Sequence, residues 1–541
     1  MSTQEALTLP EALKQSFTNF SDRPSLGFVG KKSYTYKEVQ EQVENLAAQL
    51  QTAGYNRNNK IAILSSNMPN WGISFFSIAF TGAVVVPILP DFSPNEITNI
   101  LTHGEVDAIF VSKQLEAKID REALPKLRVF DMETLQEITP DGNKVIAEAT
   151  SADFQHVSID EEDLVSIIYT SGTTGTSKGV MLSHKNLVWT SYKCKSLQPI
   201  NEFDRFLSIL PLSHTFENTL GLIYPMLYGS SVQYLSKAPT PQILLPALKE
   251  VKPTIMLSVP LIIEKIYRGK ILKELNSNSI TKVLYKFRPT RIVLSRIAGK
   301  KLFETFGGEL RFFGIGGAKL DNETERFLMD AKFPLAIGYG LTECSPLLAG
   351  AVGENVRFKS TGIPLEGVQI RIANADSKTG EGEIQAKGGN IMKGYYKSPE
   401  LTQGTFTEDG WFKTGDLGKF SKGKLYIKGR IKNMILGSTG ENIYPEEIES
   451  LINRKDFVLE SLVLQQKGRL VAMVHLNLEE IETKYTQFKE DLNIKIDEVL
   501  AEIQQSINEE VSKFSRLQMV VLQPVPFEKT PTMKIKRFLY S

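Results

Sequence analysis

The first third of the chain alternates between helical and strand-like spacing of its hydrophobic residues. Apolar side chains between positions 39 and 50 recur at the spacing of one helix face. Thr35 and Glu38 form a capping-box pattern just before them, and Gly54 follows as a stop signal. The pattern predicts a helix that begins after Thr35 and ends near Gly54.

Short apolar runs that follow this helix are typical of buried strands. They occupy residues 60–64, 84–86, 108–111, 164–169 and 180–182. Strands that alternate with helices favour parallel sheets covered by helices on both faces. The sequence therefore predicts an α/β fold for the larger, N-terminal part of the chain.

The C-terminal stretch has a different pattern. Strand-like runs at 462–464 and 470–475 precede a charged helical pattern at 488–512, which is typical of a small α+β unit. At 541 residues the chain is longer than one core usually supports, since about 150 residues per domain is common. Turn-forming and charged residues mark the boundary between the two patterns. We expect units at 1–428 and 434–541, joined by 429–433.

Composition and charge narrow the class of protein. The net charge is +1, so the whole molecule has no electrostatic preference for nucleic acid, and we expect no nucleic-acid partner. Two cysteines, Cys194 and Cys344, favour a reducing compartment over a disulfide framework. The N-terminus lacks the pattern of a signal peptide, and the apolar stretch 71–90 is interrupted by glycine and proline. We expect a cytoplasmic protein.

One segment, residues 281–301, has a local excess of basic residues and no acidic residue. Apolar residues are interleaved with its cations, which are Lys282, Lys286, Arg288, Arg291, Arg296, Lys300 and Lys301. One interpretation is the solvated basic face of an amphipathic helix. The other is a surface that touches anionic lipid, which would place the protein peripherally at the inner face of a membrane.

A loop rich in glycine and hydroxyl side chains follows the strand-like run at 164–169. It spans Thr170–Gly179 and ends with Lys178 before another strand-like run. Glycines let backbone N–H groups approach anionic oxygens, hydroxyls add donors, and a lysine adds positive charge. The loop thus suits a triphosphate. Its glycines, Gly172 and Gly175, are spaced differently from those of a Walker loop, which disfavours a P-loop ATPase or kinase.

Further motifs follow this loop along the chain. They are Gly314–Ala318, Gly338–Glu343, Gly410–Asp416, Gly429–Asn433, Gly440–Glu449 and Thr530–Arg537. With the loop, and in this order, they resemble the adenylate-forming superfamily, which comprises acyl-CoA synthetases, adenylation domains of peptide synthetases and luciferases. The resemblance extends over nearly the whole chain. It implies a large N-terminal adenylation domain of sheets and helices and a small mobile C-terminal α+β lid.

The resemblance also implies roles for individual residues. Lys534, Thr342 and Glu343 are the expected catalytic residues, and Thr170 and Glu343 the expected contacts of Mg²⁺. The expected ATP-binding residues are Thr170, Ser171, Gly172, Thr173, Thr174, Gly175, Lys178, Gly316, Gly317, Ala318, Gly338, Tyr339, Gly340, Asp416 and Arg430. Lys432 occupies the hinge position, and His214, Gly440, Glu441 and Asn442 are expected along the path of the acid or the thiol.

Two positions depart from the family pattern. Gly429 stands where an aspartate is frequent, a change that also occurs in family members. Met533 replaces the usual glycine before Lys534 and could restrict the backbone there. Lys536 is a neighbouring cation that could be confused with Lys534.

The implied reaction has two steps, with ATP, Mg²⁺ and CoA. A carboxylic acid is activated as acyl-AMP with release of pyrophosphate, and the acyl group then passes to a thiol. Segments 258–267 and 435–445 resemble those of long-chain fatty acid–CoA ligases, which favours a fatty acid and CoA. The alternatives are transfer to an acyl carrier protein, an aryl or short-chain acid, and a non-catalytic adenylate-binding scaffold. The sequence leaves the oligomeric state open.

Overall fold

A nine-stranded sheet forms the N-terminal part of the molecule. The computed structural model describes residues 6–139, 141–145, 148–170, 177–436, 441–485, 492–530 and 534–540. Within these residues the strand order is β19 (Gly394–Tyr395), β9 (Lys178–Ser183), β8 (Leu164–Thr170), β3 (Val84–Ile88), β2 (Lys60–Leu64), β4 (Ala108–Val111), β5 (Arg128–Asp131), β6 (Glu137–Ile138) and β7 (Lys144–Val145).

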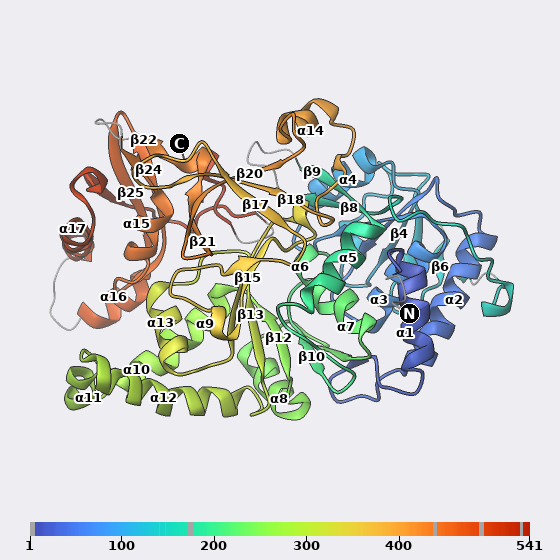
Figure 1. Cartoon of the computed structure of the whole chain (residues 1–541), viewed down its shortest axis with the longest axis horizontal. Helices are drawn as coiled ribbons and strands as arrows, with labels where there is room; N and C mark the ends of the chain where they lie inside the picture. Colours follow the sequence, from blue (N-terminus) through green and yellow to red (C-terminus); the bar gives the residue numbers. More distant parts are fainter. Residues whose placement is uncertain are drawn as a thin grey trace.

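An eight-stranded sheet lies beside it, near the centre of Figure 1. Its order is β1 (Leu26–Phe28), β11 (Ser231–Tyr234), β10 (Arg205–Ser208), β12 (Ile255–Ser258), β13 (Phe312–Ile315), β14 (Leu335–Tyr339), β15 (Ala349–Ala351) and β16 (Ile363–Pro364). One hydrophobic cluster contains side chains from both large sheets and from the helices that pack on them. The two sheets therefore share a core rather than forming separate units.

Helices cover these sheets. They are α1 (Leu9–Asn19), α2 (Tyr36–Thr52), α3 (Pro69–Phe80), α4 (Pro94–Gly104), α5 (His184–Cys194), α6 (Thr215–Glu217), α7 (Tyr224–Leu227), α8 (Pro241–Val251), α9 (Pro260–Ile266), α10 (Lys273–Asn276), α13 (Asn322–Asp330) and α14 (Pro399–Thr405). Helix α3 is buried along almost its whole length. No helix among the described residues is both long enough and apolar enough to cross a lipid bilayer.

The helix and the strands predicted for the N-terminal part are confirmed. Helix α2 begins after Thr35, whose hydroxyl accepts from the Glu38 N–H while the Glu38 carboxylate accepts from the Thr35 N–H. Strands β2, β3, β4, β8 and β9 lie where strand-like runs occur. The α/β fold class is confirmed.

The prediction of parallel sheets is right for the central strands and wrong at the edges. Strands β2, β3, β4, β5 and β8 are parallel, but β8 pairs antiparallel with β9. The reason is the short connection between them, residues 171–177, because a parallel pair needs a crossover of a dozen or more residues. Strands β6, β7, β15, β16 and β19 also join antiparallel.

Two smaller sheets complete the fold. One has the order β17 (Gln369–Ala373), β18 (Gly382–Lys387), β20 (Phe412–Ser421) and β21 (Lys424–Arg430). The C-terminal stretch contains the hairpin β22 (Ile435–Leu436)–β23 (Asn442–Ile443), helices α15 (Pro445–Ile452), α16 (Leu478–Tyr485) and α17 (Leu492–Glu510), and a sheet of β24 (Val458–Gln466), β25 (Arg469–Leu476) and β26 (Met519–Leu522). It has its own hydrophobic cluster and lies at the left of Figure 1.

The basic segment does not form the single helix expected from its pattern. It folds as α11 (Ser279–Leu284) and α12 (Arg288–Thr305), separated by a short turn. Pro289 lies in the first turn of α12, where proline is tolerated, and proline disfavours helical geometry in the residue before it. Helix α12 carries large apolar side chains, Val293 and Ile297, on the same exposed face as its cations.

Candidate functional site

The motif residues converge at the carboxyl ends of strands from both large sheets. Strand β8 ends at Thr170, β13 is followed by Gly316–Ala318, and β14 ends at Tyr339. In mixed α/β folds, ligands bind at this edge of the parallel strands. Strand β20 of the third sheet contributes Asp416 to the same place.

Asp416 contacts two other residues of this cluster. Its Oδ2 accepts from the Tyr339 hydroxyl at 2.7 Å, and its Oδ1 lies 2.7 Å from Arg430 Nε. Asp416 and Arg430 are cross-strand partners of β20 and β21, so the sheet itself sets the pair. Burial raises the pKa of Asp416, and the charge of Arg430 acts in the opposite direction.

Glu343 lies in a short helical turn, Thr342–Cys344, directly after Gly340 and Leu341. Its Oε1 accepts from the Tyr395 hydroxyl at 2.9 Å. The backbone N–H of Met392 donates to its carbonyl oxygen at 2.9 Å. Both contacts come from the segment around β19: Tyr395 orients the carboxylate, and Met392 fixes the backbone of Glu343.

Lys178 is the first residue of β9 and pairs in register with Thr170, the last residue of β8. Its ammonium lies 5.5 Å from the centre of the Tyr395 ring. Its pKa is lowered, first by burial and then by the charge of Lys432, while Glu343 raises it. Lys178, Lys432 and Glu343 are therefore close in space. Ser171, Gly172, Thr173, Thr174 and Gly175 lie outside the described residues.

Lys534 reaches this cluster from the far end of the chain. Its pKa is lowered, chiefly because its ammonium is buried and next because Arg430 is near, while Asp416 and Glu343 raise it. Lys534 is nevertheless exposed to solvent as a residue. The charge of Lys534 also lowers the pKa of His214. The structure thus brings Lys534, Glu343, Asp416 and Arg430 together.

Close backbone packing explains two of the motif glycines. A Cβ on Gly340 would lie 1.8 Å from the carbonyl oxygen of Pro346, which leaves no room for any side chain. Gly317 has a φ of +83°, a conformation that side chains rarely adopt. Both glycines are needed for the turns that follow β13 and β14.

The segment around His214 lines the same region. His214 begins a continuous helical stretch in which six residues, Asn218–Ile223, are π-helical, a geometry often found at functional sites. Its Nδ1 accepts from the Phe216 N–H at 3.2 Å. Burial lowers the pKa of His214 to about 4, so the ring is neutral at pH 7. A Cβ on Gly316 would lie 3.1 Å from the Phe216 ring.

A narrow apolar cavity of about 60 Å³ begins beside Phe216 and follows β13 and β14. Its lining is almost wholly hydrophobic and comprises Cys194, Leu197, Gln198, Ile200, Phe206, Phe216, Leu220, Tyr224, Ile255, Leu257, Phe312, Gly314, Ile315, Ala336, Ile337, Gly338, Leu347, Gly350 and Val352. The cavity is thus lined by residues of β13 and β14, the two strands whose carboxyl ends lie at the polar cluster.

For most of the remaining predicted residues the structure gives a position in the fold. Thr342 is the first residue of the turn that contains Glu343, Gly338 lies in β14, and Gly317 and Ala318 are exposed after the end of β13. Glu441 and Asn442 lie in the β22–β23 hairpin of the C-terminal stretch. Gly440 lies outside the described residues.

Sequence reasoning missed several residues that the structure adds to the site. Tyr395 supports Glu343, and Thr414 accepts from the Asp416 N–H at 3.0 Å. Thr414 lies within the Gly410–Asp416 motif, but no local sequence motif marks Tyr395 or the cavity residue Phe312. Glu217 is buried, burial raises its pKa to about 8, and the Ser208 hydroxyl donates to its carboxyl group at 2.6 Å.

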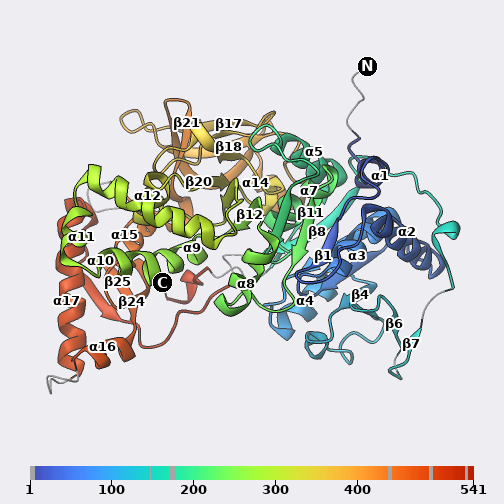
Figure 2. The same cartoon turned by 90° about the horizontal axis from the view of Figure 1, so that it is seen from below.

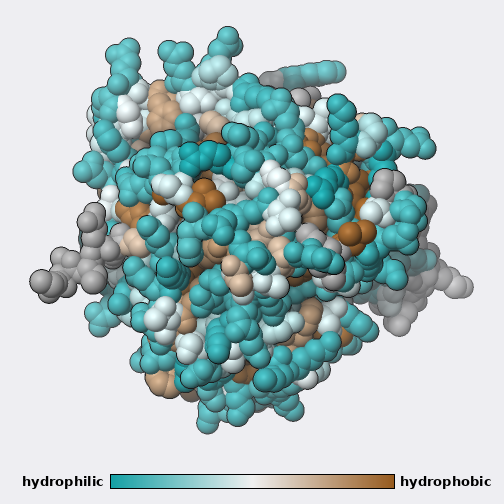
Figure 3. Space-filling model, turned by 90° about the vertical axis from the view of Figure 1, so that its right-hand side faces the viewer, coloured by the Kyte–Doolittle hydropathy of each residue, from teal (hydrophilic) through white to brown (hydrophobic). Residues whose placement is uncertain are grey.

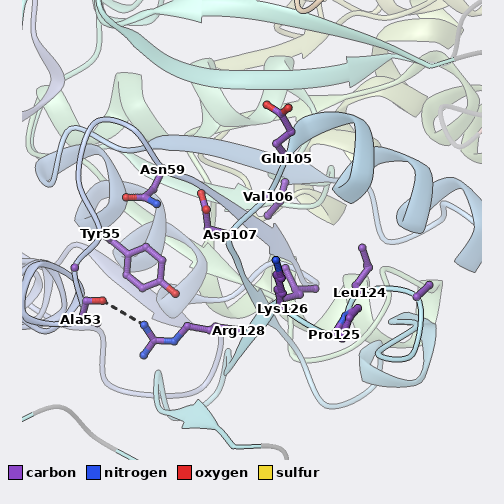
Figure 4. A pocket seen from close by; sticks show the side chains of 13 residues that line it. Ala53, Tyr55, Asn59, Glu105, Val106, Asp107, Leu124, Pro125, Lys126 and Arg128 are labelled. Atoms are coloured by element: carbon purple, nitrogen blue, oxygen red, sulfur yellow. Dashed lines mark hydrogen bonds between the residues drawn. The ribbon is translucent and has the colours of Figure 1, made fainter.

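A second, larger cavity lies elsewhere. It measures about 570 Å³ and adjoins the starts of β2, β4 and β5, where Asn59, Asp107 and Arg128 lie (Figure 4). Two of its charged side chains have partners. Arg128 donates to Glu137 at 2.7 Å, and Asp107 accepts from the Lys60 N–H at 2.8 Å. It is at the opposite end of the parallel strands from the polar cluster and takes no part in it.

Comparison with known proteins agrees with this geometry. Residues 13–396 match the family described as AMP-binding enzyme. The long-chain-fatty-acid–CoA ligase heimdall of Drosophila melanogaster is 30% identical over 527 residues, which cover 87% of this chain and 76% of that protein. A chloroplastic long-chain-fatty-acid–acyl-carrier-protein ligase of Arabidopsis thaliana is 27% identical, over 93% of this chain and 80% of its own length.

Solved structures share the fold over almost the whole chain. The ATP-bound MatB from Rhodopseudomonas palustris superposes with a TM-score of 0.76 at 23% identity, covering 98% of both chains. The matched family spans most of this sequence, and the motif residues converge on one site. The chain therefore belongs to the AMP-binding enzyme family and is an adenylate-forming acid–thiol ligase.

Proposed function

We propose that this enzyme activates a long-chain fatty acid as its acyl-adenylate and transfers the acyl group to CoA. ATP, Mg²⁺ and CoA are the co-substrates of this family. The observation that carries the proposal is the almost wholly hydrophobic cavity lined by side chains such as Phe312 and Leu347, together with the likeness to a ligase named for long-chain fatty acids. A fatty acid has a polar carboxylate that reacts and an apolar tail that does not.

The polar cluster fits MgATP. Glu343 offers a carboxylate oxygen, the ligand type that Mg²⁺ prefers when substrate phosphates supply the rest of its coordination. Lys178 and Lys534 are near Glu343 and offer positive charge for the phosphates. Asp416 already accepts from Tyr339 and Arg430, and each carboxylate oxygen has capacity for a further bond from a ribose hydroxyl.

In the first step the acid's carboxylate attacks the α-phosphorus of ATP, giving acyl-AMP and pyrophosphate. Lys534 would stabilise the charge that develops on the phosphate, and Glu343 would hold Mg²⁺, which would neutralise charge on the phosphates. Positioning and charge neutralisation account for most of the catalysis in such transfers. His214 is neutral and lies beside Phe216 at the mouth of the cavity, so it contacts the acid without adding charge.

In the second step a thiol attacks the acyl carbonyl and AMP leaves. We propose that residues 434–541 act as a lid that turns about Lys432, withdrawing Lys534 and bringing Gly440, Glu441 and Asn442 towards the site. The influence of Arg430, Asp416 and Glu343 on the pKa of Lys534 supports assigning this orientation to the adenylation step. One site would then serve both steps through domain motion.

CoA is the proposed thiol because a relative that covers most of the chain is named a CoA ligase. The named carrier-protein ligase makes an acyl carrier protein the second candidate. The chemistry of the site is the same for both acceptors, since each presents a phosphopantetheine thiol. Only the surface around the entrance would differ.

Product analysis by mass spectrometry tests the proposal. The protein is incubated with ATP, Mg²⁺ and palmitate, octanoate or benzoate, and with either CoA or a phosphopantetheinylated carrier protein. We expect palmitoyl-CoA, AMP and pyrophosphate, with less product from the other two acids. Acyl transfer only to the carrier protein would mean that the thiol acceptor is not CoA. Product only from benzoate or octanoate would mean that the acid is not a long-chain fatty acid.

A further inference from the structure

Helices α11 and α12 form a surface that combines exposed apolar side chains with cations. The apolar side chains are Ile280, Val283, Leu284, Phe287, Val293 and Ile297, and the cations beside them are Lys282, Lys286, Arg288, Arg296 and Lys300. We call these eleven residues the basic–apolar surface. Ile280 is 68% exposed and Phe287 61%, which is unusual for side chains of this size.

The packing of α12 explains why its bulky side chains point outwards. The face that meets the protein carries Ser295, Gly299 and Leu302, which are buried. A Cβ on Gly299 would lie 2.5 Å from the Cβ of Ala331, so the helix lies directly against the end of α13. The larger apolar residues of α12 are thereby left on the outside.

The exposed face of α12 is continuous. Val293, Arg296, Ile297 and Lys300 follow one another at the spacing of a single helix face. Arg291 is directed inwards, because its Nε pairs with Asp330 at 2.8 Å. This ion pair fixes the rotation of the helix and hence which residues face outwards.

The charge of the surface is wholly positive. No acidic residue occurs between Leu275 and Phe303. Within the described part of the chain, Lys301 pairs with Glu274 and Arg291 with Asp330, whereas the five cations of the basic–apolar surface form no ion pair. These five charges are available to an external anion.

The surface lies at the edge of the molecule. Figure 1 places α11 and α12 along the lower margin, away from β8 and β9, and in Figure 2, which is seen from below, α12 faces the viewer. The face at the opposite, N-terminal end is predominantly hydrophilic, with only scattered apolar residues (Figure 3).

We propose that the basic–apolar surface docks the enzyme on a bilayer that contains anionic lipid. Apolar side chains on helices that lie flat enter the boundary between headgroups and acyl chains, while neighbouring lysines and arginines attract anionic headgroups. A nucleic acid would use the cations but leave the aliphatic side chains in water. A second copy of the same surface would bring like charges together.

Vesicle flotation tests this proposal with the full-length protein. Vesicles contain phosphatidylcholine alone or with about one third phosphatidylglycerol, a fraction chosen to make the surface strongly anionic. We expect the protein to float with the anionic vesicles at least tenfold more than with the neutral ones. Raising the ionic strength reduces this binding, because the charges are exposed.

Two variants separate the contributions of charge and apolar contact. Lys286→Glu/Arg296→Glu/Lys300→Glu reverses three cations, and Val293→Ser/Ile297→Ser removes two apolar side chains. All five positions are exposed, so folding is retained, as thermal denaturation and adenylation of a soluble acid will check. Each variant loses more than tenfold of the vesicle binding.

A matched control makes the same change of net charge elsewhere. Lys378→Glu/Lys422→Glu/Lys467→Glu alters three exposed turns and leaves vesicle binding unchanged within about twofold. Wild-type protein that stays at the bottom of the gradient, or a control that loses binding as strongly as the surface variants, would overturn the proposal. So would an apparent dimer in lipid-free solution that Val293→Ser/Ile297→Ser dissociates, because it would assign the surface to a second copy.

Discussion

At the scale of single residues, the site depends on charges that the fold holds close together. Asp416 and Arg430 are paired by the register of two strands, and Glu343 is oriented by Tyr395. Lys534 adds a cation whose pKa is lowered by burial and by Arg430. A lysine in this environment is readily desolvated and interacts strongly with phosphate.

Removing Lys534 tests its role directly. We expect Lys534→Ala to slow adenylation by about 10²–10³, the usual effect of losing one preorganised charge contact. ATP affinity changes little, and thioester formation from supplied acyl-AMP continues. ATP–pyrophosphate exchange and ATP binding by calorimetry measure the two quantities.

Lys536 provides the matched control for this experiment. It is two residues away and is the cation most easily mistaken for Lys534. Lys536→Ala should retain adenylation within a few-fold. Equal losses in both variants would contradict the assignment, and loss of ATP binding in Lys534→Ala would reduce its role to that of a binding residue.

Glu217 makes a different contribution, to stability. Its folded pKa of about 8 exceeds the usual value of 4.5, so the folded state holds the proton more tightly than the unfolded state. The stability from this group is fully present below pH 4.5 and is lost as pH rises through about 8. We expect Glu217→Gln to raise the thermal midpoint at pH 8. The corresponding gain in the free energy of unfolding is on the order of a few kcal/mol, as the size of the pKa shift implies.

The same variant at low pH serves as its own control. Near pH 5 wild-type Glu217 is mostly protonated in the fold, and the amide closely replaces the neutral acid. The gain should therefore shrink towards zero as pH falls. A gain that is independent of pH would show that Glu217 is ionised in the folded protein.

At the scale of elements, an ion pair joins the C-terminal stretch to the body. Arg454, which follows α15, lies with its Nε 2.9 Å from Oδ1 of Asp321. The other oxygen of Asp321 caps α13 by accepting from the N–H groups of Glu323 and Thr324. The Arg268 guanidinium donates to the Asn453 carbonyl oxygen beside this pair.

We expect this ion pair to favour the orientation in which Lys534 lies in the site. Asp321→Asn keeps an acceptor for the cap of α13 but removes the charge. Pyrophosphate exchange should then fall by about fivefold or more, because the adenylation orientation is less populated. Thioester formation from supplied acyl-AMP should not fall with it.

A double-mutant cycle checks the source of the effect. Arg454→Gln should reproduce the change, and Asp321→Asn/Arg454→Gln should add little to either single variant. Additive losses would mean that the two residues act independently. An unchanged exchange rate in both single variants would contradict the role of the ion pair.

The cavity between strands gives a second prediction at this scale. Ala336 of β14 lines it, and its side chain is small and buried. Ala336→Leu fills room for about three carbons, and each methylene that is excluded costs ~0.8 kcal/mol. We expect kcat/KM for palmitate to fall by tenfold or more, while that for octanoate changes little.

Overpacking is the confounding effect, and a smaller change controls for it. Ala336→Val fills less of the cavity and should produce an intermediate shift in chain-length preference with a nearly unchanged thermal midpoint. A uniform loss for all acids would indicate distorted packing. An unchanged preference in a folded Ala336→Leu protein would place the acyl chain elsewhere.

At the scale of the whole molecule, the sequence predicts the fold class and most of the polar site. Periodicity locates α2 and the strands β2, β3, β4 and β8, because each is long and its pattern is regular. Periodicity does not predict the antiparallel edge strands or the break before α12. The first depends on a short connection between strands and the second on one proline. The residues of the polar cluster are recognised because they occur in dense local motifs.

The apolar side of the site is not predictable in the same way. Phe216, Phe312 and Leu347 line one cavity although they are far apart in the chain, and each also has the pattern of an ordinary core residue. Tyr395 and Arg454 act through partners that only the fold brings near. The substrate's tail is bound by such residues, which is why the acid is harder to predict than the reaction.

The central claim is that the acid's carboxylate attacks the α-phosphorus of ATP. It is tested most directly with palmitate labelled with ¹⁸O at both carboxylate oxygens, in the presence of ATP, Mg²⁺ and CoA. We predict that the AMP product carries one ¹⁸O atom, because the bridging oxygen of acyl-AMP leaves with AMP when the thiol attacks the carbonyl. Unlabelled AMP, or ADP with labelled phosphate, would contradict an acyl-adenylate intermediate.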